Sequence, residues 1–313
     1  MRIGLDIMGG DFAPNSTVLG AIAAQAHLTQ NQHLVLIGDK DLITPLLAEQ
    51  NFNPDHFEYI HTTEVIGMGE HPTKAIVQKP NSSISVGFQL LKEGNIDSFA
   101  SAGNTGAMLV GAMFSVKAIS GVIRPAISAI MPKLKGGFKI LLDAGANADC
   151  KPENLLQFAV LGSLYAKHVY HIDDPQVGLM NLGEEAEKGS LLTQATYPLL
   201  KESELINFFG NIEGRDLFND KADVVVCDGF TGNVMLKLAE SFYVLTLKKG
   251  LKDEFFDRFN YEQYGGSPIL GVNAPVMIGH GISSPVAIKN MILLSKEMVE
   301  TKIIEKFKTA FNS

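Results

Sequence analysis

The fold is decided by the stretch Ile96-Asp97-Ser98-Phe99-Ala100-Ser101-Ala102-Gly103-Asn104-Thr105-Gly106-Ala107. Residues 96–100 are typical of a strand, and residues 108–117 continue as a helical pattern. The small residues between them form a turn at which the free N–H groups of the helix can converge on an anion. A tight strand-to-helix turn that needs glycine only for packing has the same composition, so this stretch alone leaves both interpretations open.

Two more units of the same kind favour an anion site. Val224–Cys227 has the β-branched composition of a buried strand, and the turn of residues 228–233 follows it before a helix expected from about Val234. Gln176–Met180 is another short strand, followed by the polar turn of residues 181–189. Ligands of open α/β sheets bind beyond the carboxyl ends of the strands, where all three turns would lie.

Strand-like runs alternate with helical patterns along the whole chain. The runs are residues 3–7, 34–38, 57–61, 96–100, 126–131, 139–143, 176–180, 205–209 and 224–227. This order predicts the α/β class, with a three-layer α/β/α architecture and a mostly parallel sheet. We expect a single domain over residues 1–313, with a helical amphipathic segment near 234–264. Lysines alternate with apolar residues at 247–258, which indicates a solvated helix face or a docking surface for an acidic partner.

Composition excludes several classes of function. The chain has 313 residues, 46% of them hydrophobic, and a net charge of −8 without a long basic stripe, which argues against nucleic acid as a partner. The two cysteines, Cys150 and Cys227, show no metal-ligand spacing, and neither a metal nor a cofactor is expected. The first strand begins almost at Met1, and the longest apolar stretch is broken by charges, so we expect a cytoplasmic protein without a signal peptide or transmembrane helix.

Several carboxylates and amides have two interpretations. Asp6 and Asp11 flank a Gly-Gly bend, where Asp11 could cap the next helix or either residue could orient a substrate group. Asp143, Asn147 and Asp149 lie in a glycine-containing bend that turn chemistry alone would also explain.

Two cations are candidates for binding phosphate. Lys188 follows three glutamates at an expected helix start, where its ammonium could bind phosphate or instead pair with Glu184. Arg215 offers two parallel donors, which Glu213 or Asp216 could also neutralise. Cys227 ends an apolar strand and is interpreted as a small buried hydrophobe. The histidines lack a Gly-x-Ser-x-Gly elbow, which disfavours serine hydrolysis.

Taken in order, these motifs resemble the acyl-[acyl-carrier-protein]:phosphate acyltransferases of bacterial phospholipid synthesis, over essentially the whole chain. The matching segments are residues 8–11 with Pro14, 101–107, 124–125, 143–147, 183–189, 210–216, 227–233, 264–271, 280–281 and 287–290. The resemblance implies a fold similar to isocitrate and isopropylmalate dehydrogenases and to phosphotransacetylases. It also implies a homodimer that makes acyl phosphate from acyl-acyl carrier protein and inorganic phosphate, and glycerol-3-phosphate acyltransferase as a downstream partner.

Phosphate is itself the nucleophile in that reaction, so no covalent enzyme residue is required. We expect catalytic contributions from Lys188, Asn147, Asp228 and Asn233. The residues expected to bind phosphate or the acyl thioester are Ser101, Gly103, Asn104, Thr105, Gly106, Arg215 and Gly232.

Two departures and three alternatives accompany the resemblance. Phe12 stands where many relatives carry histidine, and the segment before Tyr264 is shorter and more charged than the apolar hairpin that attaches relatives to membrane. Weak membrane association through Leu251, Phe255 and Phe256 therefore stays open, as does carrier-protein binding by the nearby lysines. The alternatives are acyl transfer from coenzyme A by a phosphotransacetylase, an isopropylmalate-type dehydrogenase using Asp143 and Asp228 as metal ligands, and a non-catalytic scaffold that binds acyl carrier protein.

Overall fold

The computed structural model describes residues 1–312, which form two compact units. The first unit comprises Met1–Lys117 and Glu262–Glu300, and the second comprises Ala118–Tyr261 together with the residues from Thr301 onward. Both units are of the α/β type, as the alternation of strands and helices predicts. Whether the chain folds as one domain stays a prediction.

The first unit is built on a mostly parallel sheet with the strand order β3-β2-β1-β4-β12-β11. Its strands are β1 (Arg2–Asp6), β2 (His33–Gly38), β3 (Phe57–His61), β4 (Ser98–Ser101), β11 (Ser267–Leu270) and β12 (Val276–Ile278). Only the β11–β12 pair in this run is antiparallel. The carboxyl ends of β1, β4 and β12 therefore lie side by side at one edge of the sheet.

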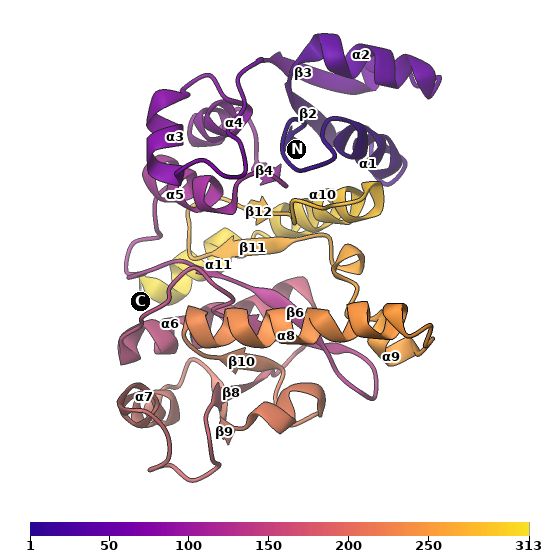
Figure 1. The fold of residues 1–313 in the computed structure, drawn as a ribbon. Helices are drawn as coiled ribbons and strands as arrows, with labels where there is room; N and C mark the ends of the chain where they lie inside the picture. Colours follow the sequence, from indigo (N-terminus) through magenta and orange to yellow (C-terminus); the bar gives the residue numbers. More distant parts are fainter. Residues whose placement is uncertain (313) are drawn as a thin grey trace. The chain divides into compact units, whose positions relative to one another are not determined.

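Helices cover both faces of this sheet (Figure 1). They are α1 (Asn15–Gln25), α2 (Lys40–Glu49), α3 (Pro72–Gln78), α4 (Ser83–Lys92), α5 (Thr105–Ser115) and α10 (Pro285–Glu300), with a short 3-10 turn η1 (Pro54–His56). Helices α1 and α10 pack on each other, as do α4 and α5. Another 3-10 turn, η3 (Tyr261–Gln263), leads the chain back into this unit.

The second unit has the sheet order β6-β7-β10-β8-β9. Its strands are β5 (Ala126–Ile127), β6 (Ala129–Pro132), β7 (Phe138–Leu142), β8 (Gln176–Met180), β9 (Asn207–Ile212) and β10 (Val224–Val226). Its helices are α6 (Pro152–Val169), α7 (Leu191–Glu202), α8 (Gly229–Lys248), α9 (Glu254–Asp257) and α11 (Ile303–Phe311), with the 3-10 turn η2 (Gly214–Phe218). All strand pairs are parallel except β6–β7.

Alternating side chains of β10 place helices on opposite faces of this second sheet. Val224 meets Gly162 of α6, whereas its neighbour Val225 belongs to a buried cluster with Ala239 of α8. Successive residues of a strand point to opposite faces, so α6 and α8 cover different sides (Figure 1). The buried valines of this strand therefore pack against a helix on each face of the sheet.

Most strands lie within two residues of the predicted bounds, and two differ more. The run 126–131 divides at Ser128, because Ile127 bonds to Asp143 and Ala144 whereas residues from Ala129 pair antiparallel with β7. The strand expected at 205–209 runs instead from Asn207 to Ile212, because it pairs along the whole of β8. A register shift between Val177 and Gly178 lets β9 extend through Gly210, whose φ of 124° favours glycine.

Among residues 1–312, every helix is too short or too polar to cross a bilayer.

Strand β7 carries a buried lysine, Lys139. Its side chain is fully buried, and its Nζ has no hydrogen-bond partner among the described residues. Burial, with a further contribution from the charge of Lys133, lowers the pKa of Lys139 to about 8, while Asp216, Asp223 and Asp220 oppose the shift. A buried ammonium without a partner destabilises the folded state.

We expect Lys139→Met to raise the free energy of unfolding at pH 7 by roughly 1–3 kcal/mol. Between about pH 8 and the ordinary lysine pKa of 10.5, the unfolded parent chain binds more protons than the folded one, so its stability rises with pH. The advantage of the variant should therefore shrink over that window. Urea unfolding at pH 7 and pH 9.5 measures this, with the exposed Lys135→Met as the control. Equal stability of K139M and K135M at pH 7 would contradict the expectation.

Candidate functional site

Polar turns follow three adjacent parallel strands of the second unit. Strand β10 pairs in parallel with β7 on one side and β8 on the other, so their carboxyl ends lie at the same edge of the sheet. Residues 143–147 follow β7, residues 227–228 lead from β10 into α8, and residues 181–190 follow β8. Two of the three turns singled out in the sequence therefore lie beside each other, whereas the turn at 101–106 belongs to the first unit.

Asp143 holds the turn after β7. Its buried carboxylate accepts hydrogen bonds from the backbone N–H groups of Ile127, Gly145, Ala146 and Asn147, at 2.6–3.2 Å. The side-chain amide of Asn147 adds a fifth bond at 2.9 Å and also donates to Pro125 O at 2.8 Å. The carboxylate therefore organises the turn, and Asn147 is fixed by it.

The start of α8 is pressed against this turn. The N–H of Gly229 donates to Asn147 O at 2.7 Å, and a Cβ at position 229 would lie 2.7 Å from that oxygen. At Gly232 a Cβ would collide with the carbonyl oxygen of Asp143. Asn233 is exposed, and its Nδ2 lies 3.4 Å from Ala144 O. The glycines of the motif are thus required by close packing of helix against turn.

Helix α8 begins five residues earlier than the sequence predicts, because Asp228 caps it. One carboxylate oxygen accepts from the Thr231 N–H and the other from the Thr231 hydroxyl, each at 2.8 Å. An N-cap carboxylate satisfies the free N–H groups of the first turn, so residues 229–233 become helical despite their loop-like composition. The structure therefore brings Asn147, Asp228, Gly232 and Asn233 to one place.

Lys188 is exposed in the loop after β8. Its side chain lies over Gly183, and its carbonyl accepts from Asn181 Nδ2 at 3.0 Å. The alternative ion pair with Glu184 is not the one observed: Glu184 pairs with Lys221 at 2.6 Å. An i,i+4 pair requires a helix, and residues 184–188 are not helical.

Arg215 lies in the turn η2 and forms an ion pair with Glu213, which is one of the two alternatives that the sequence leaves open. Its Nε is 2.7 Å from Glu213 Oε2, and its side chain is 72% exposed. The neighbouring Asp216 bonds to Lys221 and Asn219. Burial acts to raise the pKa of Asp216, but hydrogen bonds from Glu213 N–H, Lys221 and Asn219 outweigh it and lower that pKa.

In the first unit, the residues predicted to bind an anion form a connected turn of their own. Ser101 is buried and donates to Asp6 Oδ2 at 2.7 Å, while the Gly103 N–H donates to Ser101 Oγ at 2.9 Å. Burial raises the pKa of Asp6, against hydrogen bonds from Ser101, Ser83 and the N–H groups of Met8 and Gly9.

Asn104 caps α5 and ties it to a neighbouring loop. Its Oδ1 accepts from Ala107 N–H at 3.0 Å, and its Nδ2 points at the carbonyls of Gly67, Met68 and Glu70, each at 3.1 Å. In the same turn, Thr105 is exposed, and a Cβ at Gly106 would collide with Pro72 of α3. The side-chain amide of Asn104 is therefore committed to the protein itself.

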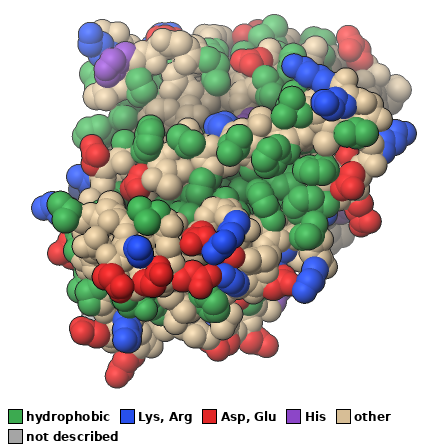
Figure 2. Space-filling view, turned by 60° about the horizontal axis from the view of Figure 1, so that its bottom comes forward, with side chains coloured by type: hydrophobic (Ala, Val, Ile, Leu, Met, Phe, Trp, Pro, Cys, Tyr) green, Lys and Arg blue, Asp and Glu red, His purple; other side chains and the backbone are tan. Residues whose placement is uncertain are grey.

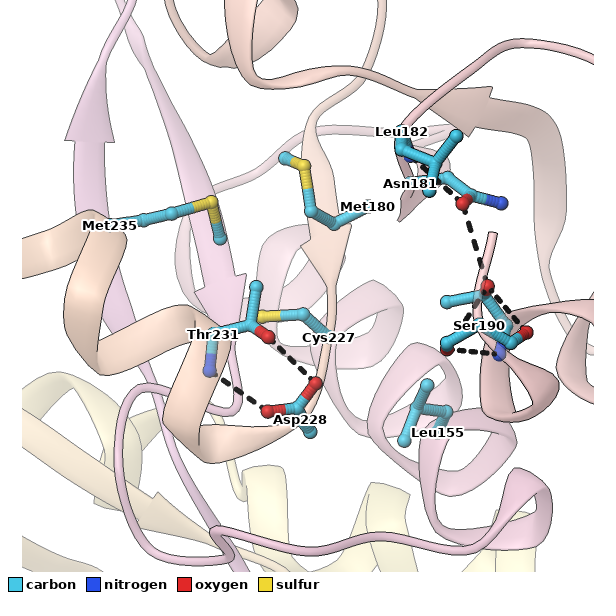
Figure 3. A pocket seen from close by; sticks show the side chains of 10 residues that line it. Leu155, Met180, Asn181, Leu182, Ser190, Cys227, Asp228, Thr231 and Met235 are labelled. Carbon is cyan, nitrogen blue, oxygen red and sulfur yellow. Dashed lines mark hydrogen bonds between the residues drawn. The ribbon is translucent and has the colours of Figure 1, made fainter. Parts of the chain in front are cut away.

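A cavity of about 310 Å³ opens beside Asp228 in the second unit (Figure 3). Its lining residues are Leu155, Met180, Asn181, Leu182, Ser190, Thr193, Cys227, Asp228, Thr231 and Met235. Of these, sequence reasoning named only Asp228 as a site residue. The apolar ones were missed because an apolar residue in a strand or helix has the same pattern whether it faces core or cavity. The polar ones, Asn181, Ser190, Thr193 and Thr231, were missed because such residues are common in turns and at helix starts whatever their role.

No group of three or more His, Cys, Asp or Glu side chains within residues 1–312 is arranged to hold a metal ion.

The fold is similar to that of solved phosphotransacetylases and of a dehydrogenase. EutD phosphotransacetylase from Staphylococcus aureus superposes with a TM-score of 0.66, covering 96% of this chain and 94% of its own, at 18% identity. A 4-hydroxythreonine-4-phosphate dehydrogenase from Klebsiella pneumoniae reaches 0.54 at 11% identity, covering 95% and 98% of the two chains. These likenesses define an α/β fold that transferases and a dehydrogenase have in common.

Sequence comparison identifies the family. The model of the fatty acid synthesis protein family matches residues 1–255 and 242–306. The phosphate acyltransferase of Dictyoglomus turgidum is 41% identical, covering 100% of this chain and 98% of its own, and that of Desulforamulus reducens is 44% identical with the same coverage. The chain belongs to the fatty acid synthesis protein family, which confirms the resemblance predicted from its motifs.

The contact between Gly232 and the turn at Asp143 can be tested by adding one methyl group. Alanine is the better helix former by about 1 kcal/mol, so Gly232→Ala would stabilise α8 if space were free. Because the new Cβ collides with Asp143 O, we expect a net loss of about 1–3 kcal/mol in the free energy of unfolding, measured in urea. Gly214→Ala is the matched control, since nothing lies within 4 Å of its Cβ position. A G232A protein as stable as G214A would refute the close approach.

Proposed function

We propose that this protein transfers an acyl group from acyl-acyl carrier protein to inorganic phosphate, releasing acyl phosphate and free carrier protein. The observation that carries the proposal is the match, over the whole chain, to proteins named phosphate acyltransferase. In this reaction a phosphate oxygen attacks the thioester carbonyl carbon. The C–O bond forms, the C–S bond breaks, and the carrier's thiol leaves with the proton that phosphate gives up.

The candidate site supports this chemistry through positioning and charge. Asn147, whose amide nitrogen is held by Asp143 and Pro125, and Asn233 lie around the start of α8. Lys188 is an exposed cation in a neighbouring loop. We propose that Lys188 binds phosphate and that Asn147, Asp228 and Asn233 shape the reacting centre, with Gly232 allowing their close approach. The contributions of Arg215 and of residues Ser101–Gly106 to binding stay predictions.

A direct assay tests the function. Purified protein is mixed with long-chain acyl carrier protein, and free thiol is followed with and without phosphate, while hydroxylamine traps acyl phosphate as a hydroxamate. We expect thiol release that requires phosphate and yields hydroxamate. Thiol release without phosphate would indicate a thioesterase. Turnover of acyl-coenzyme A but not of acyl carrier protein would indicate a phosphotransacetylase, and reduction of a nicotinamide would indicate a dehydrogenase. Each of these outcomes would contradict the proposal.

Lys188 is tested in the same assay. Lys188→Ala should fold normally, since the side chain is exposed, and lower kcat/KM for phosphate by about 10²-fold. Lys201→Ala removes an exposed lysine from α7 and serves as the control. Turnover and phosphate affinity of K188A close to those of K201A would exclude Lys188 from the site.

We further propose that two copies of the chain pair through α8. Phe230, Val234, Leu238 and Leu245 are each at least half exposed and recur at a spacing of four or seven residues, which places them on one stripe of the helix. Figure 2 shows apolar side chains gathered in a band on one face of the molecule. A twofold axis would bury the same stripe of both copies, and monomers rarely leave such a patch uncovered.

Light scattering measures the mass in solution. The parent chain should have the mass of two copies and Leu238→Glu that of one, because a carboxylate would be buried in the interface. Leu42→Glu, which changes an exposed leucine of α2, should stay dimeric. A monomeric parent, or a dimeric L238E, would overturn this arrangement.

The remaining parts of the prediction are proposals as well. They are the three-layer α/β/α architecture of the isocitrate and isopropylmalate dehydrogenase type, a cytoplasmic location, and consumption of the acyl phosphate by glycerol-3-phosphate acyltransferase. The likeness to a solved 4-hydroxythreonine-4-phosphate dehydrogenase supports the first.

A further inference from the structure

The cavity beside Asp228 has a buried floor and an exposed rim. Leu155 and Cys227 are almost fully buried, and Met180 is 8% exposed, whereas Leu182 is 72% exposed. Figure 3 shows Met180 and Met235 projecting into the space between α8 and the loop after β8. The cavity therefore extends from solvent into the apolar interior of the second unit.

The polar side chains that line the cavity are engaged with one another. Both carboxylate oxygens of Asp228 accept from Thr231. Asn181 donates to Lys188 O and accepts from Leu182 N–H, and Ser190 accepts from Thr193 N–H. These bonds hold the loop and the helix in place, so the surface left for a ligand consists mainly of carbon and sulfur.

This lining disfavours phosphate as the occupant. A phosphate dianion needs cations or free donors, and the charged group in the lining is the carboxylate of Asp228. Burial, with the charges of Asp228 and Asp143, raises the pKa of the Cys227 thiol well above its ordinary value, so Cys227 is a neutral, apolar part of the wall.

Size and shape favour a flexible alkyl chain. An apolar cavity of about 150 Å³ binds benzene, a molecule of six carbons. The volume of about 310 Å³ therefore holds a chain of roughly ten carbons. Methionine side chains adapt their conformation to an apolar partner, and Met180 and Met235 both line the space.

The cavity also adjoins the proposed reacting centre. Asp228 lines it, and the next residue, Gly229, donates to Asn147 O. We infer that this cavity holds the hydrocarbon chain of the acyl substrate, with the thioester carbonyl near Asn147 and the chain running toward Met180 and Leu155. The inference rests on the proposed function and assigns a place in the second unit to about ten carbons of the substrate's acyl chain.

Binding is tested first, because it does not depend on turnover. The chain contains no tryptophan, so the single indole introduced by Leu182→Trp at the rim reports on the cavity alone. Decanoate brominated near its methyl end should quench this emission saturably, and unlabelled decanoate should reverse the quenching. Met113→Trp, at a half-exposed position of α5 in the first unit, is the control and should not be quenched.

Kinetics then test the role in catalysis. Met235→Trp fills the cavity from α8, and we expect kcat/KM for hexadecanoyl-acyl carrier protein to fall at least ten-fold, with the value for butyryl-acyl carrier protein changed less than three-fold. An equal loss for both chain lengths would overturn the inference. So would equal quenching of L182W and M113W, or a shift of L182W emission by pantetheine without any effect of decanoate.

The two proposals fail differently. If the parent chain forms acyl phosphate from both substrates but decanoate does not bind, the cavity has another role and the proposed function stands. If decanoate binds but no acyl phosphate forms with either chain length, the proposed function fails. Should M235W not fold, the quenching of L182W still decides the question.

Discussion

The arrangement of the second unit depends on the hydrogen bonds to the buried carboxylate of Asp143. Five donors from Ile127 and residues 145–147 converge on its two oxygens. Bonds to a charged group contribute about 1.5–3 kcal/mol each, and their loss would leave buried N–H groups unsatisfied. The turn that they fix presents Asn147 O to the first N–H of α8, and α8 in turn carries Asp228 to the edge of the cavity.

The first unit also has a buried carboxylate, Asp6, at the carboxyl end of a strand. Asp6 ends β1, is buried, and accepts from the hydroxyl of Ser101 at the end of the neighbouring β4. A Cβ at Gly9 would lie 2.5 Å from its Oδ2 and 2.7 Å from Gly103 N, so the loop after β1 fits against the turn only without a side chain. In both units a strand-end carboxylate therefore holds a neighbouring turn in place.

The sequence predicted the class of fold well because buried parallel strands need long β-branched runs, such as Val224–Val226, that few other elements tolerate. Local composition misled in two places, one decided by a helix cap and the other by strand pairing. Residues 229–233 have the composition of a loop and are helical because Asp228 caps them, and β9 extends to Ile212 because β8 pairs with it. The cavity was not predictable, since Leu155 and Met180 have the patterns of core residues. Of the residues predicted as catalytic, the structure gathers Asn147, Asp228 and Asn233, and the role of each stays a prediction.

The glycines at the start of α8 lie beside the candidate site because they allow close packing. The composition of residues 228–233 predicts a backbone that approaches an anion, yet what approaches Gly229 and Gly232 is the turn at residues 143–147. That packing places the Asp228 carboxylate on the cavity, where it repels a phosphate dianion. In the proposed arrangement, phosphate is therefore held on the solvent side by Lys188 and the acyl chain on the apolar side. The two substrates meet only at the carbonyl carbon, which is the atom that has to be attacked.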